Sequence, residues 1–112
     1  MYIPPVQTIR NIGEILRYEM PRETAEMLLQ IRTLEAMRYE LNVDICDWGR
    51  MLAEKRAQML HPKDKELTEL DRKTMLHASV AVIERDFDFL CNLQPLVEDR
   101  LGFLRMFLQI KG

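Results

Sequence analysis

Apolar residues recur at alternating intervals of four and three through the central part of this sequence. From Met27 to Met59 this spacing selects ten positions, of which eight are apolar. Such spacing lines one face of an α-helix that packs against a neighbouring helix. It predicts a helix over about residues 22–60. Its inward positions are Met27, Ile31, Leu34, Arg38, Leu41, Ile45, Trp48, Leu52, Lys55 and Met59.

A second stripe with the same spacing occupies the C-terminal part of the chain, and nine of its ten positions are apolar. It predicts helices over about 65–92 and 95–110. Because the stripe keeps its register across Pro95, we expect this proline to kink or interrupt the helix without reversing the chain. The members are Leu76, Val80, Ile83, Phe87, Leu90, Gln94, Val97, Leu101, Leu104 and Leu108.

The segment HPKDK, residues 61–65, is the clear turn between the two stripes, so they should form a long antiparallel hairpin. A short helix over about 5–19 precedes it. With 4 Gly and 5 Pro in 112 residues, helix-favouring residue types dominate. We predict a single all-α domain over 1–112, a three- to four-helix bundle. Asp44 or Asp47 could instead cap a break near Asp44–Gly49, and Gly49 could mark a close approach of two helices.

The C-terminal helix carries more apolar surface than one stripe requires. The extra residues are Phe89, Leu93, Leu96, Phe103, Met106, Phe107 and Ile110. A helix that is apolar on most sides is buried on most sides. Either the chain's own helices cover this second face, or a second copy completes the bundle. We favour the homodimer, because each large apolar side chain left in water forgoes about 1.5–3 kcal/mol.

The charge and cysteine content narrow the class of protein. A net charge of −2 indicates no polyanion-binding surface, and two cysteines are too few for a disulfide framework. We expect no signal peptide and no membrane span, hence a cytoplasmic protein. Cys46 and Cys91 are interpreted as packing residues. Cys46 has no basic neighbour that would make it a nucleophile, and the hairpin places Cys91 too far from Cys46 for a disulfide.

One alternative function is a metal-dependent all-α hydrolase with a carboxylate and histidine site between the hairpin helices. If the hairpin folds near residue 62, Asp47 lies opposite His77 and Glu40 lies opposite Glu84, with Asp44 between them. Oxygen ligands suit Mg²⁺ or Mn²⁺, and a histidine extends the choice to Zn²⁺ or Fe²⁺. A solvated acidic edge of the helices explains the same residues.

A second alternative is contact with nucleic acid through the hairpin tip. The tip carries a small surplus of basic residues, namely Arg50, Lys55, Arg56, Lys63, Lys65, Arg72 and Lys73. A nucleic-acid-binding arm usually carries more charge and some base-reading side chains. We therefore expect an ordinary solvated turn and no nucleic-acid partner.

The sequence contains no ordered catalytic set, phosphate-binding loop or zinc-finger spacing. Its apolar residues are instead concentrated on helix faces. We therefore expect a non-enzymatic coiled-coil-like interaction module, an adaptor, assembly factor or small regulator that acts as a homodimer. A further protein partner is compatible with this function, and no cofactor is expected.

Overall fold

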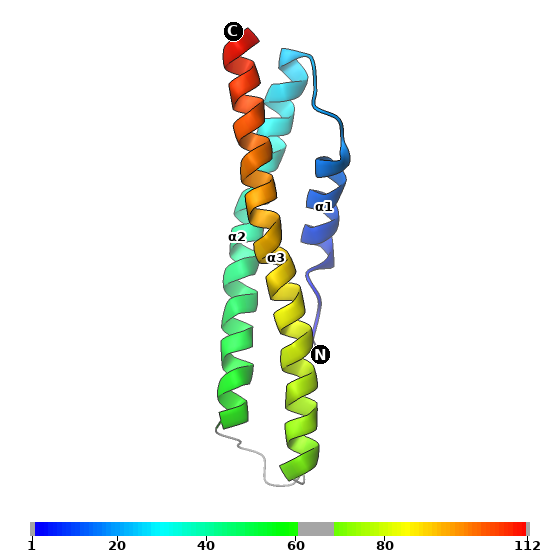
Figure 1. Ribbon diagram of the computed structural model, residues 1–112, viewed down its shortest axis with the longest axis vertical. Coiled ribbons are helices and arrows are strands. Elements are labelled where there is room, and N and C mark those ends of the chain that lie inside the picture. Colours follow the sequence, from blue (N-terminus) through cyan, green and yellow to red (C-terminus); the bar gives the residue numbers. More distant parts are fainter. Residues whose placement is uncertain (1, 61–68, 112) are drawn as a thin grey trace.

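The computed structural model describes the backbone of residues 2–60 and 69–111, and the side chains of 2–59 and 78–110. These residues form three helices, α1 (Val6–Arg17), α2 (Thr24–Leu60) and α3 (Glu69–Lys111), with no strand among them. The two long helices lie side by side and run in opposite directions, and α1 lies against their upper half (Figure 1). The all-α class and the helical hairpin are confirmed.

The chain break expected between 92 and 95 is absent, because α3 runs continuously through Pro95. Pro95 is exposed, so the backbone hydrogen bond that it removes lies where water can replace it. Leu90 and Val97, on either side of the proline, are fully buried and hold both parts of the helix in one line. The alternative break near Asp44–Gly49 is also absent, since α2 is continuous.

Both predicted stripes form the hairpin core. On α2 the buried members are Met27, Leu34, Leu41 and Leu52; on α3 they are Ile83, Leu90, Val97, Leu101 and Leu104. Trp48 is half-buried against this core. Gly49 lets the helices approach: a Cβ there would lie 3.2 Å from Cε2 of Phe87. The glycine therefore marks the close contact expected from the sequence.

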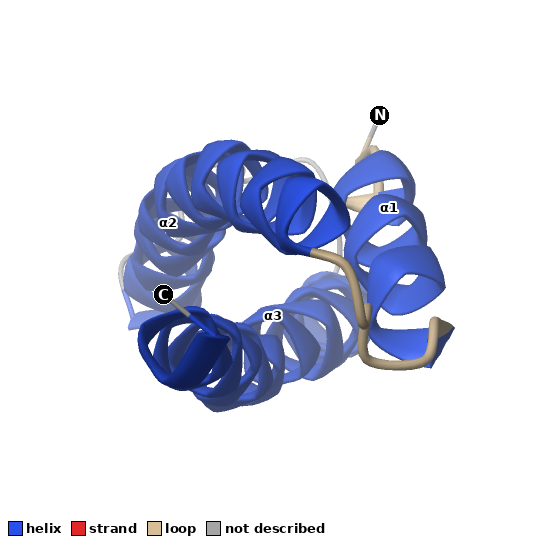
Figure 2. Cartoon of the chain, turned by 90° about the horizontal axis from the view of Figure 1, so that it is seen from above, coloured by secondary structure: helices blue, strands red, loops and turns tan. Residues whose placement is uncertain are grey.

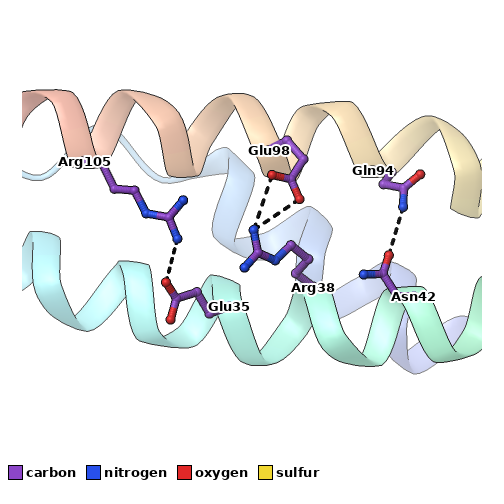
Figure 3. A network of polar contacts seen from close by, with 6 residues as sticks. All are labelled: Glu35, Arg38, Asn42, Gln94, Glu98 and Arg105. Atoms are coloured by element: carbon purple, nitrogen blue, oxygen red, sulfur yellow. Dashed lines mark hydrogen bonds and ion pairs between the residues drawn. The ribbon is translucent and has the colours of Figure 1, made fainter.

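Three polar pairs bridge α2 and α3 on the side of the hairpin away from α1 (Figure 3). Arg105 lies 2.7 Å from Glu35, Arg38 lies 3.3 Å from both carboxylate oxygens of Glu98, and the Gln94 amide donates to Asn42 at 2.9 Å. All three pairs are partly or fully exposed to solvent. They define how the two helices are aligned.

This alignment differs from the expected one. Glu84 pairs with Arg56 at 3.2 Å and not with Glu40, which lies about four helical turns away along α2. The fold-back at residue 62 was the wrong assumption, because the described pairs align α2 with a later part of α3. Asp47 lies between Asn42 and Gly49, which face Gln94 and Phe87, so it does not lie opposite His77.

Helix α1 packs into one side of the hairpin through Ile12 and Ile15, both buried (Figure 2). Arg100 of α3 fastens its C-terminal end by donating hydrogen bonds to the carbonyls of Ile15 and Tyr18. A cation at this end of a helix complements the helix dipole and its free carbonyls. The result is a third layer over only part of the hairpin's length.

The molecule is long and thin, measuring 66 × 18 × 16 Å. Its radius of gyration is 19.2 Å, whereas a compact domain of this length has about 13 Å. A rod of two or three helices leaves much of each helix surface uncovered by its own chain.

Candidate interaction surface

Six of the seven apolar residues assigned to the second face of α3 are solvent-exposed. The exposed fractions are 50% for Phe89, 52% for Leu96 and Phe103, 46% for Met106, 37% for Phe107 and 73% for Ile110. Leu93 is the exception, with 7% exposed, because it turns into the core that α1 completes. The chain's own helices thus leave this face largely open.

Five exposed apolar residues follow α3 at intervals of seven: Val82, Phe89, Leu96, Phe103 and Ile110. We call this row the outer stripe. A spacing of seven keeps side chains on one side of a helix over many turns, and is the spacing of coiled-coil contact positions. Val82 was not among the residues expected from the sequence, although this interval would have identified it.

A second row lies beside the outer stripe. Each of its residues comes three positions after a residue of the outer stripe. It consists of Arg85, Asn92 and Asp99, followed by Met106, and all four are exposed. Residues three apart are neighbours on a helix surface. The free face of α3 therefore combines an apolar row with a second row whose three polar residues begin with the positive Arg85 and end with the negative Asp99. We call these three residues the polar row.

The C-terminal end of the outer stripe borders a hollow between α3 and the segment that joins α1 to α2. The hollow, about 620 Å³ and open to solvent, is lined by Phe107 and Ile110 together with Glu19, Met20, Pro21, Arg22 and Met27. Its apolar walls continue the exposed surface onto the connecting segment.

Near the other end of the stripe, a partly buried polar cluster holds the N-terminal segment to both long helices. The Tyr2 hydroxyl donates to Asp86 at 2.6 Å and accepts from the Trp48 indole nitrogen at 2.7 Å. Burial, together with the hydrogen bond to Asp86, raises the pKa of Tyr2 to about 12. This cluster could not be predicted from the sequence, since a single tyrosine that contacts two distant helices leaves no periodic pattern.

The four candidate metal ligands whose side chains the structure describes are not brought together. Asp44 accepts a hydrogen bond from Thr8, Asp47 pairs with Arg50 at 3.2 Å, and Glu40 is exposed on α2. Glu84 pairs with Arg56 as described above, and the side chain of His77 lies outside the described residues. Within the described part of the chain, no three His, Cys, Asp or Glu residues are grouped so as to hold a metal ion.

Three of the seven basic residues predicted for the hairpin tip have described side chains. Arg50 and Arg56 form the ion pairs with Asp47 and Glu84, and Lys55 is half-buried. The side chains of the other four predicted residues lie outside the described residues: Lys63, Lys65, Arg72 and Lys73. The two arginines that are described are therefore engaged by carboxylates of the same chain.

The two cysteines lie in different environments. Cys46 is exposed on α2, so its assignment as a packing residue is wrong. Cys91 is half-buried, and burial, with a smaller contribution from the charge of Asp88, raises the pKa of its thiol. Both are free thiols.

Comparison of the chain with models of known protein families, with curated proteins and with solved structures gives no match. In the parts of the helices that the structure describes, no stretch is both long enough and apolar enough to cross a membrane. Functional inference therefore rests on the surface described above.

Proposed function

We propose that this protein is a non-enzymatic helical interaction module, an adaptor, assembly factor or small regulator, which acts as a homodimer through the free face of α3. The observation that carries the proposal is the outer stripe: five apolar side chains at a spacing of seven, all exposed. Covering a half-exposed side chain of this size contributes about 1 kcal/mol. A contiguous apolar row of this kind is typical of a protein-binding surface.

The thin shape of the molecule supports the same proposal. Short helical hairpins commonly pair to complete a four-helix arrangement, and two-fold dimers are the commonest assemblies. A second hairpin placed along α3 would cover the face that α1 and α2 leave open.

The experiment compares two double variants by light scattering across a range of concentrations. Phe89→Ser/Phe103→Ser removes two large side chains of the outer stripe, and Leu29→Ser/Tyr39→Ser removes two apolar residues of α2 that are still more exposed. We expect the α3 variant to be monomeric and helical by circular dichroism, and the α2 variant to remain dimeric. Equal loss of association in both variants would refute the α3 face as the contact surface.

A further inference from the structure

We propose that the second copy binds α3 antiparallel, with Asn92 close to the two-fold axis. The inference rests on the proposed function and adds the orientation and register of the partner. It follows from the order of charges in the polar row and from the positions of large and small residues around it.

The charges of the polar row are opposite on the two sides of Asn92, its central residue. Arg85 lies seven residues before Asn92, and Asp99 lies seven residues after it. In an antiparallel pair centred on Asn92, Arg85 of each copy faces Asp99 of the other. Two opposite-charge contacts then form, and the two Asn92 amides meet, each able to donate and accept a hydrogen bond.

A parallel pair in register would place Arg85 against Arg85 and Asp99 against Asp99. Like charges brought together across an interface oppose association, so charge complementarity selects the antiparallel orientation. In the single chain Arg85 pairs with Asp86 at 3.4 Å, but its side chain is 72% exposed, so the guanidinium can also contact a carboxylate of a second copy.

The residues of the outer stripe also pair in this register, with an offset of one residue from exact opposition. When Asn92 faces Asn92, Phe89 lies beside Leu96 of the second copy and Val82 lies beside Phe103. These contacts are repeated by the two-fold symmetry, as a self-complementary interface requires. The outer stripe of one copy is thereby covered by the outer stripe of the other.

The opposite flank of the polar row contains two small residues, Ala81 and Gly102. They face one another in this register, and both are exposed. A Cβ at Gly102 would meet nothing within 4 Å in the single chain, so packing within the chain does not require glycine there. In the pair, the missing side chain lets the second helix come close.

Orientation is tested by measuring the distance between spin labels in the dimer. The native cysteines are first removed by Cys46→Ala/Cys91→Ala, and this background must keep the dimer mass and the helicity of the native chain. The label is then attached at Gln109→Cys, near the end of α3. In the antiparallel register the two labels are about 51 Å apart along the helix axis. In a parallel pair they are separated by about the 10 Å between helix axes plus the label arms.

Charge exchange in the native background gives a second measurement. We expect Arg85→Glu and Asp99→Arg each to weaken the dimer about tenfold, and the double variant to return to within about threefold of the native dissociation constant. Arg32→Glu, an exposed charge reversal on α2, is the control and should have no effect.

The outcomes separate the two proposals. A dimer with a short label distance, or without rescue in the double variant, overturns the antiparallel register and leaves the proposed function intact. A native chain that stays monomeric overturns the proposed function and this inference together.

Discussion

The Tyr2 hydroxyl lies 2.6 Å from a carboxylate oxygen of Asp86, across 84 positions of sequence. Asp86 is 8% exposed, and its other partner is the neighbouring Arg85 at 3.4 Å. This hydrogen bond, together with the one from Trp48, ties the N-terminal segment to α2 and α3. The two hydrogen bonds therefore connect the N-terminal segment, α2 and α3 beside the N-terminal end of α1, beyond which α1 no longer covers the hairpin.

Tyr2→Phe should lower the free energy of unfolding by about 1–3 kcal/mol. The substitution keeps the ring but leaves the Asp86 carboxylate and the Trp48 indole N–H without this partner, and an unsatisfied buried polar group has a cost of that size. Urea unfolding followed by circular dichroism measures the change. Tyr18→Phe, at an exposed tyrosine, is the control and should alter stability by less than about 0.5 kcal/mol.

The same tyrosine predicts how stability changes in alkali. Its pKa is about 12 in the folded protein and 10.0 in the unfolded chain, so the unfolded state loses its proton first. The stabilisation is complete below pH 10 and is lost as the pH rises towards 12. Melting temperatures measured from pH 9 to pH 11.5 should fall more steeply for the native chain than for Tyr2→Phe. Parallel curves would contradict this assignment.

Two glycines provide a paired test of helix packing. At Gly13 an added Cβ meets nothing within 4 Å, so Gly13→Ala should stabilise the protein by about 0.5–1 kcal/mol through helix propensity. Gly49→Ala should gain less or destabilise, because its Cβ would press on the Phe87 ring at 3.2 Å. Equal gains in thermal stability would show that the helices are not in close contact at Gly49.

The two thiols should differ in reactivity. Cys46 is exposed, whereas Cys91 is half-buried and has a raised pKa, so less of it is present as the reactive thiolate. With Ellman's reagent at pH 8 we expect one fast and one slow phase. Cys46→Ser should remove the fast phase, and loss of the slow phase instead would reverse the assignment.

The helices were predictable because their inward residues repeat. Leu34, Leu41, Leu90 and Val97 lie on stripes visible in the sequence, and all four are fully buried. The register between the stripes was not predictable, since the repeat within each stripe defines its inward face but not how far one helix is shifted along the other. In the observed alignment Glu84 lies opposite Arg56 and not opposite Glu40, so these two candidate metal ligands lie apart.

The exposed face of α3 was predictable from its excess of apolar residues, apart from two positions. Leu93 was assigned to the surface, but it is buried in the core cluster to which Ile12 and Ile15 of α1 also belong, and a single stripe on α3 does not predict that third helix. Val82 was omitted because the excess was sought near the C-terminus. The Tyr2 cluster was missed entirely, since hydrogen bonds between distant side chains follow no repeat.

Sedimentation equilibrium of the native chain at micromolar to millimolar concentration tests the central claim most directly. If the outer stripe of α3 is covered by a second copy, the measured mass is twice the 13.3 kDa of the single chain. A mass of 13.3 kDa throughout this range, with the protein fully helical, would contradict it.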